Sequence, residues 1–324
     1  MRSRRVSGRR CSSFPAQAAA ACVLLFAAAM PARSQPAFAH KPNLCEQSVR
    51  HVARSCKEEA ESDYLLALAN CDNLSDEGAR GTCRDDAAAE LKDAIDSCGE
   101  QEDARDDVCD RLGGGPYDPV IDPKNFVDEI DNPYFPLAPG TTFVYEGPTA
   151  DGLEHEEFAV THDTRTILGV ACVVVHDRVF IAGELVEDTH DYFAQDEAGN
   201  VWYFGENSAE VEDGLVVSLE GSWLGGVDGA KPGIVMEATN RVGDFYRQEF
   251  ALANAEDLAE VVGLHETVTV PYGTFHDCLK TRETTPLDVE DISFKFYCPG
   301  IGEVKTQDVP PGDEQLELID IVTD

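Results

Sequence analysis

Residues 45–109 decide the fold of the first part of the chain, and they read CEQSVRHVARSCKEEAESDYLLALANCDNLSDEGARGTCRDDAAAELKDAIDSCGEQEDARDDVC. The six cysteines in this stretch occupy positions that are mirror-symmetric about residue 77. Two antiparallel helices that fold back at this point would bring each cysteine next to its mirror partner. Other connectivities exist, but this geometry predicts a helical hairpin stapled by three nested disulfides, Cys45–Cys109, Cys56–Cys98 and Cys71–Cys83.

The residues around the cysteines also favour two helices. Asn43, followed three residues later by Glu46, is a capping-box pattern that marks a helix start. Small and apolar residues then recur around Cys56 and Cys98 with the 3.6-residue period of a helix face. A zinc site is the competing explanation, but zinc-binding cysteines stand close together in sequence, whereas these are 11 to 15 residues apart. Structural disulfides, each contributing about 2–4 kcal/mol, are therefore favoured.

The first 39 residues have the pattern of a secretory signal peptide. Arginines at positions 2, 4, 5, 9 and 10 precede an apolar run at 16–30, and Ala37-Phe38-Ala39 fits a cleavage site. An uncleaved anchor is the alternative, but the run is shorter than the ~20 residues that a spanning helix needs. We therefore expect a secreted or periplasmic protein without a stable membrane anchor, and disulfides fit such an oxidising location.

The chain is strongly acidic. It has 25 Lys and Arg residues against 62 Asp and Glu residues, a net charge of −37. Loss of residues 1–39 would remove basic residues only and make the charge more negative. Such a field repels phosphate backbones and anionic membrane surfaces, so nucleic acid is excluded as an expected partner. A highly solvated surface is the simplest explanation, and loose capture of divalent cations is another.

We expect the hairpin to occupy residues 40–112, a Gly- and Pro-rich linker to follow at 113–124, and a β domain to fill 125–324. Strands are expected near 141–147, 154–162, 170–181, 184–194, 200–206, 210–219, 244–251, 264–270, 274–282, 291–298, 301–307 and 315–322. Residues 255–262 allow a short helix instead. The predicted fold class is α+β, with a mainly antiparallel curved sheet or open barrel after the hairpin.

Two β-hairpins can be described in more detail. A four-residue loop at 196–199 would pair Gln195 with Asn200, which sets Phe193 opposite Trp202 and Tyr192 opposite Tyr203. Further on, the two cysteines at 278 and 298 are symmetric about a turn-like stretch. We expect an antiparallel hairpin there with a fourth disulfide, Cys278–Cys298. This leaves Cys172, inside an apolar run, as a buried free thiol without assigned chemistry.

The sequence lacks the common catalytic and cofactor motifs. No G-x-S-x-G, H-E-x-x-H, phosphate-loop, dinucleotide or EF-hand pattern occurs. Missing motifs lower the expectation of an enzyme without excluding one, and the sequence indicates no particular cofactor.

Two histidines flank the turn at Ala182-Gly183. A three-residue loop at 182–184 sets His176 opposite His190, whereas a loop centred on Ala182 sets His176 opposite Asp188. These three side chains on one face would suit copper or zinc. A calcium pocket is the alternative, formed by Glu184, Glu187, Asp188 and Asp191. A solvated strand face without any ligand is the more common arrangement.

Aromatic residues and one glycine-rich stretch are candidates for a ligand site. A ligand cleft could be lined by Trp202, Tyr203, Trp223 and Tyr246, although aromatic residues in a β domain more often form the core. Residues 221–233 contain many glycines and suit either a functional loop or a plain connector.

Several short motifs resemble those of an uncharacterised family of exported bacterial β-domain proteins. The motifs are NPYFPL at 132–137 with PGTT at 139–142, QD at 195–196 with GNVWYFGE at 199–206, GSW at 221–223, DGA with PGI at 228–234, and PGIG at 299–302. The resemblance covers about residues 130–308, implies an exported β domain, and assigns no catalytic or binding residue. Residues 296–304 are also similar to strand pairs in envelope lipoprotein-like sheets that hold lipids on a concave face.

These observations favour a non-enzymatic, exported β-domain protein that binds a small or lipidic ligand on a concave sheet. A metal-binding exported protein that uses His176 and His190, with copper, zinc or calcium as the metal, is the first alternative. An extracytoplasmic hydrolase is the second.

Overall fold

The computed structural model describes residues 43–310, 312 and 315–324. The predicted signal peptide at 1–39 lies outside these residues. The described residues from 43 onward cluster as one compact unit.

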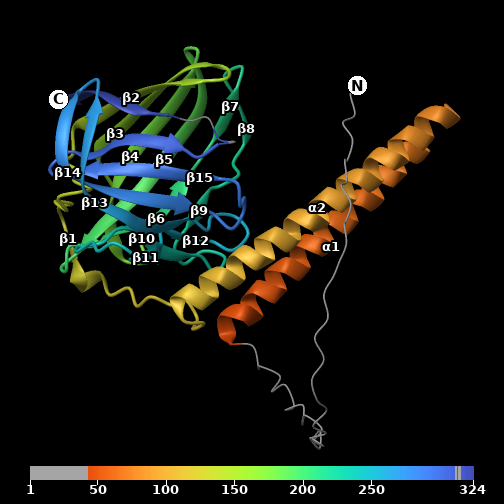
Figure 1. Cartoon of the computed structure of the whole chain (residues 1–324), viewed down its shortest axis with the longest axis horizontal. Coiled ribbons are helices and arrows are strands. Elements are labelled where there is room, and N and C mark those ends of the chain that lie inside the picture. Colours follow the sequence, from red (N-terminus) through yellow and green to blue (C-terminus); the bar gives the residue numbers. More distant parts are fainter. Residues whose placement is uncertain (1–42, 311, 313–314) are drawn as a thin grey trace, which may run out of the picture. The chain divides into compact units, whose positions relative to one another are not determined.

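The helical hairpin is present as predicted. It consists of α1 (Leu44–Asp72) and α2 (Glu77–Leu112), two long antiparallel helices (Figure 1). Asn43 caps α1: its Oδ1 accepts a hydrogen bond from the Glu46 amide at 2.9 Å, and its Nδ2 donates to Glu46 Oε1 at 2.8 Å. Asp76 caps α2 by accepting from the Ala79 amide, and Gly113 ends α2 in a left-handed conformation with φ 86°.

The three predicted disulfides hold the two helices together. Their Cα–Cα distances are 5.7 Å for Cys45–Cys109, 5.9 Å for Cys56–Cys98 and 5.6 Å for Cys71–Cys83. The disulfides matter here because the hairpin buries few apolar side chains of its own, chiefly those of Val49, Ala53, Ala87 and Val108. A thin hairpin with so little core depends on covalent staples for its stability.

The rest of the structure is a large antiparallel sheet preceded by a 3-10 turn at Pro123–Asn125 (Figure 1). Its strands are β1 (Phe126–Val127), β2 (Thr141–Thr149), β3 (Gly152–Ile167), β4 (Val170–Ile181), β5 (Glu184–Asp196), β6 (Val201–Asn207), β7 (Glu210–Glu212), β8 (Leu215–Ser218), β9 (Trp223–Leu224), β10 (Lys231–Met236), β11 (Phe245–Arg247), β12 (Glu249–Phe250), β13 (Leu258–Val270), β14 (Gly273–Thr284), β15 (Ile292–Cys298), β16 (Gly302–Asp308) and β17 (Glu317–Thr323).

The sheet curves around an interior. Strands β13 to β17 pair in sequence order, β17 pairs with β2, and β2 to β6 continue the series. Beyond β6 come β10 and β12, while β11 pairs back onto β13. Strand β12 therefore lies at one end of the sheet and β11 at the other, and the single residue Gln248 connects them. The two ends are joined by the backbone at this residue and not by a continuous ladder of backbone hydrogen bonds. This is the curved, open sheet of the predicted α+β fold.

Successive side chains of a strand point to opposite faces of the sheet, so the buried apolar side chains form two clusters. The larger cluster fills the concave side and includes Phe143, Val175, Phe193, Val261 and Leu318. A smaller cluster on the opposite face contains Cys172, Tyr192 and Phe204. The free thiol of Cys172 is thus buried as predicted, and burial raises its pKa to about 12, which keeps it unreactive.

Two local predictions for the β domain need correction. Residues 255–262 do not form a helix: β13 begins at Leu258 and pairs with β14, and alternate β13 side chains are buried against the core. The 196–199 loop is also wrong by one residue, because Gln195 pairs with Val201 and Phe193 with Tyr203. The Asp196 side chain accepts from the Asn200 amide, so Asn200 belongs to the loop.

Two other features of the β domain are clear. Cys278 and Cys298 form the fourth predicted disulfide, at the end of a β14–β15 hairpin that has the expected register. The glycine-rich stretch 221–233 is a packed connector that contains β9 and the start of β10. At Gly233 a Cβ atom would lie 2.1 Å from the Gln248 carbonyl oxygen, so close packing of backbones explains this glycine.

Helix α2 contacts the β domain through a buried ion pair. Arg105 and Glu256 are 4% and 1% exposed, and the guanidinium donates to both carboxylate oxygens, with distances of 2.7–3.0 Å. Six residues further along α2, Arg111 lies 3.6 Å above the centroid of the Phe245 ring. In the predicted linker, the Tyr117 hydroxyl donates to the Pro232 carbonyl at 2.8 Å.

Candidate functional site

A cavity of about 380 Å³ lies on the concave side of the sheet. Aromatic side chains form much of its wall: Phe135, Phe143, Tyr145, Phe158, Phe193, Tyr203 and Tyr297. Nine acidic side chains also line it, namely Glu154, Glu156, Asp177, Glu187, Asp191, Glu249, Asp257, Glu283 and Glu303. Lys295 is the only basic residue in this lining. Such a volume is typical of a small-molecule site.

The acids reach the cavity because side chains alternate along β-strands. On β5, Glu187, Asp191 and Phe193 face the interior, and on β4 Asp177 and Val179 do so. The predicted calcium pocket is therefore split between two faces of the sheet. Glu187 and Asp191 line the cavity, whereas Glu184 and Asp188 are not among its lining residues.

Tyr203 connects two interior carboxyl groups. Its hydroxyl oxygen lies 2.5 Å from Asp191 Oδ1 and 2.9 Å from Glu206 Oε2. A tyrosine hydroxyl has one proton, so it can donate a hydrogen bond to only one of these groups and must accept a hydrogen bond from the other. Burial, with a smaller contribution from neighbouring carboxylates, raises the pKa of Asp191 to about 7 and that of Glu206 to about 8. This arrangement therefore holds an exchangeable proton near neutral pH.

A bulge at Gly205 makes this arrangement possible. Without it, residues 203 and 206 would face opposite sides of the sheet. The register between β5 and β6 shifts between Asp191 and Phe193, and Gly205 has a φ of 131°. A Cβ atom at Gly205 would lie 2.3 Å from the Trp223 carbonyl oxygen, so only glycine fits.

Asp177 is the least satisfied of the interior acids. Its Oδ1 is shielded from solvent and has no hydrogen-bond partner among the described residues. Burial, together with the nearby charges of Glu156, Asp191 and Glu187, raises its pKa well above the usual range. Asp177 lines the cavity, so a rotation of its side chain would present this unpaired oxygen to a hydrogen-bond donor of a ligand.

Lys295 compensates only part of the negative charge. Its Nζ lies 3.5 Å from Glu283 Oε2 and 4.0 Å from Glu303 Oε2. Burial still raises the pKa of Asp257 to about 6, and burial also raises the pKa values of Glu249 and Glu303. The cavity as a whole is therefore short of positive charge.

A second cavity of about 180 Å³ adjoins the first. The two share Asp257, Glu283, Lys295 and Thr306 in their walls, so these side chains lie between them. Asp291 and Asp308 extend the acidic lining there.

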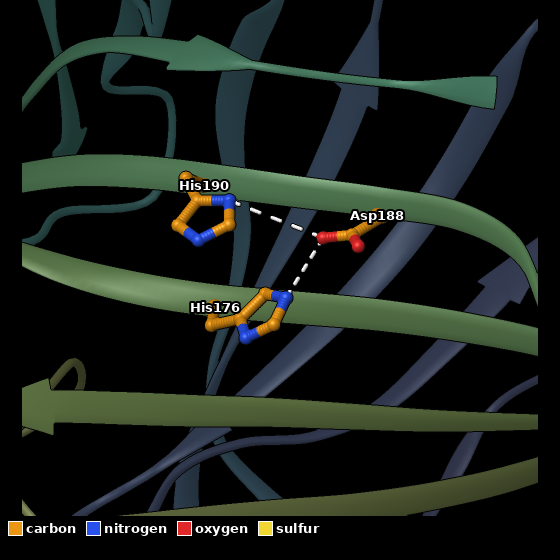
Figure 2. A group of neighbouring side chains, drawn as sticks. All are labelled: His176, Asp188 and His190. Atoms are coloured by element: carbon orange, nitrogen blue, oxygen red, sulfur yellow. Dashed lines mark hydrogen bonds and ion pairs between the residues drawn. The ribbon is translucent and has the colours of Figure 1, made fainter. Parts of the chain in front are cut away.

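The predicted metal residues meet on the convex face of the sheet (Figure 2). His176 and His190 are direct partners across β4 and β5, as in one of the two registers considered, and their rings stack with centroids 4.3 Å apart. A bulge between Val179 and Phe180 sets this register, in place of a three-residue loop. Asp188 Oδ1 lies 2.7 Å from His176 Nε2 and 4.0 Å from His190 Nδ1.

The three groups offer ligand atoms within 4.8 Å of one another, and all three side chains are half-buried. In a tetrahedral zinc site such atoms are about 3.3 Å apart, so small side-chain rotations would suffice. Burial, and then the adjacent His176, lower the pKa of His190, which favours the neutral imidazole that binds metals.

The structure separates the predicted aromatic ligand residues. Of the four predicted residues, only Tyr203 lines the cavity. Trp223 packs edge-on behind it, with ring centroids 5.5 Å apart, and Tyr246 is buried in the same core. Trp202 belongs to the opposite face, where its indole donates to Asp196 Oδ2 at 2.9 Å.

Sequence reasoning missed most of the interior acids. Glu154, Glu156, Asp177, Glu249 and Glu303 were part of what we interpreted as a solvated, acidic surface. A usable signal was present on β3, where Glu154 and Glu156 share a strand face with Phe158 and Val160.

No known family's sequence profile matches this chain, and no curated protein matches it either. The family resemblance described above therefore stays a prediction. Among solved structures, the chain is similar to the crystal structure of a protein from Parabacteroides distasonis ATCC 8503 named "putative lipoprotein". The match has 18% sequence identity and a TM-score of 0.33, and covers 58% of this chain and 98% of the other. In the part of the chain that the structure describes, neither helix is apolar enough to cross a membrane.

Proposed function

We propose that this protein acts outside the cytoplasm, in the periplasm or as a secreted protein, and binds a small organic ligand inside its curved sheet. The supporting observation is the cavity of about 380 Å³, with walls of aromatic rings and carboxyl groups, among them Asp177 with an unpaired Oδ1. The disulfides support the location, because such bonds persist in oxidising compartments. A fatty acid is a poor candidate ligand, since its carboxylate would add to the negative charge of the site.

Filling the cavity should abolish ligand retention. Val179 lines the cavity, and Val179→Trp places an indole there. The wild-type chain, purified from its own host, should carry a ligand that native mass spectrometry detects, and Val179→Trp should lose it. The matched control is Val216→Trp, because Val216 is 60% exposed on β8 and its side chain lies outside the cavity.

Equal retention by both variants would contradict the proposal. Circular dichroism of both variants shows whether the β domain is intact. The hydrolase alternative predicts turnover of the same ligand, which the mass spectra would reveal as a product.

A second candidate function is metal binding at His176, Asp188 and His190, which the convergence of these side chains favours (Figure 2). We expect the chain to bind one Zn²⁺ or Cu²⁺ there, and His190→Ala to weaken binding about 10- to 100-fold. The affinity should fall below about pH 6, because protonated imidazole cannot bind a metal.

Competition with a chromophoric chelator measures this affinity. His265→Ala is the matched control, since His265 is exposed and pairs with Asp277 at 3.0 Å. If His190→Ala and His265→Ala weaken binding equally, the metal is held by surface charge and not by this site.

A further inference from the structure

We infer that the cavity ligand is an organic cation with more than one positive centre, an aliphatic di- or polyamine, and that its binding displaces protons from the interior carboxyl groups. This inference rests on the proposed function, because it assigns a chemical class to the ligand of the same cavity. Four observations carry it, and each concerns a different property of the site.

The first observation is the imbalance of charge. Nine acidic side chains and one lysine line the cavity. Carboxylates that are buried together repel one another and lose hydration, so the empty site is costly unless protons or cations neutralise it. A ligand with several ammonium groups supplies the missing charge at several points. An anionic ligand would increase the imbalance.

The second observation is the open acceptor at Asp177. Its Oδ1 has no solvent contact and no partner among the described residues. An ammonium group has three donors and no acceptor, so it would satisfy this oxygen with a charge-assisted hydrogen bond once the Asp177 side chain rotates toward the cavity. The open acceptor therefore matches the chemistry of an amine.

The third observation concerns the spacing of the acids. Within the described residues, no three interior carboxyl groups approach closely enough to hold one ion, and the group that does so is His176, Asp188 and His190 on the convex face. A bare divalent cation needs several oxygens at about 2.3–2.6 Å for calcium. Acids that are spread around a cavity instead fit positive charges that are separated along a flexible molecule.

The fourth observation is the aromatic wall. Phe193 and Tyr203 stack with centroids 4.6 Å apart, and Phe135 packs edge-on against Phe193 at 5.3 Å. Ring faces attract cations, and they also cover methylene groups without hydrogen-bonding demands. A chain of methylenes between ammonium groups therefore meets a suitable surface.

Proton release follows from the same geometry. Asp191 and Glu206 share the Tyr203 hydroxyl, and at least one of the two carboxyl groups must be protonated for both contacts to be hydrogen bonds. When an ammonium group enters as a cation, this proton passes to solvent and the carboxylate pairs with the ligand. No other bond is made or broken.

The test is isothermal titration calorimetry of the full chain, with all four disulfides formed, against spermidine at pH 8.0 and pH 5.5. We expect one spermidine per chain at pH 8.0, with weaker binding at pH 5.5. Titrations in buffers of different ionisation enthalpy should show release of protons on binding. Asp177→Asn should weaken binding about tenfold or more, because it removes the charge but keeps the shape.

Two further variants control for misfolding and for non-specific charge effects. Lys295→Met removes the only basic side chain of the lining, so it should tighten spermidine binding, which a misfolded protein would not do. Glu212→Gln removes one exposed acid on β7 and should leave the affinity unchanged. Equal effects of Asp177→Asn and Glu212→Gln would overturn the inference, as would stoichiometric Ca²⁺ binding that depends on Asp177.

The outcomes separate this inference from the proposed function. If spermidine fails to bind while the wild-type chain retains a neutral ligand that Val179→Trp loses, the cavity binds a ligand but its assigned charge is wrong. If nothing is retained and spermidine does not bind, both proposals fail.

Discussion

Replacing Arg105 with methionine is expected to lower the free energy of unfolding by about 3–5 kcal/mol. Arg105 and Glu256 are both almost fully buried, and the guanidinium donates to both oxygens of the carboxylate. Glu256 Oε1 also accepts from the Ala253 amide at 2.7 Å. Removal of the guanidinium leaves a buried carboxylate without its counter-charge, and this is what makes the loss large.

Urea unfolding followed by tryptophan fluorescence measures the effect. Both tryptophans of the chain, Trp202 and Trp223, lie in the β domain. The fluorescence therefore reports unfolding of the β domain, which loses its contact with Arg105 of α2 in this variant. Arg54→Met is the matched control on the same hairpin. Arg54 is exposed and pairs with Glu58 one turn away, so its loss should cost about 0.5 kcal/mol or less.

The double variant Arg105→Met/Glu256→Leu should recover most of the lost stability, because two apolar side chains replace the pair. If Arg105→Met is no less stable than Arg54→Met, the ion pair does not connect α2 to the β domain in solution.

The ligand-free protein should be less stable at pH 8 than at pH 5. Burial raises the pKa of Asp191 to about 7, that of Glu206 to about 8 and that of Asp257 to about 6, all above the values of an unfolded chain. Between about pH 4 and pH 8 the folded state therefore binds more protons than the unfolded state. Under this condition stability falls as the pH rises, by several kcal/mol in total, because each unit of pKa difference is worth about 1.4 kcal/mol.

Urea unfolding at pH 5, 6.5 and 8 measures this dependence. The double variant Asp191→Asn/Glu206→Gln removes two of the groups that take up protons, so its stability should change much less with pH. Repulsion among the many surface acids remains in that variant, which makes it the internal control. If the free energy of unfolding changes equally with pH in both proteins, the interior carboxyl groups titrate normally.

The helical hairpin could be predicted from the sequence because the cysteines that define it lie within one short stretch. Cysteine positions that mirror one another about residue 77 leave few geometries in which helices can bring thiols together. The β14–β15 hairpin with Cys278–Cys298 was predictable for the same reason. Long apolar or alternating runs also located most strands to within a few residues.

The site was harder to predict because strand registers depend on bulges. The irregularities at Val179–Phe180 and at Gly205 decide which side chains share a face, and no residue pattern marked them as bulges. The acidic composition hid the interior carboxyl groups among many solvated ones. Strands β17 and β2 pair although they are over 150 residues apart in sequence. The sequence could therefore predict a curved sheet as a fold class, but not which strands pair around the cavity.

The nesting of the hairpin disulfides also bears on the order in which the protein matures. Cys71 and Cys83 are 12 residues apart, whereas the other two pairs are 42 and 64 apart. Loop-closure entropy grows with loop length, so the innermost bond is the easiest to form in a reduced chain. Once it exists, Cys56 and Cys98 each lie 15 residues from it along their own helix, in matched positions. Oxidation is therefore expected to proceed from the turn outward, with each bond placing the next two thiols in register.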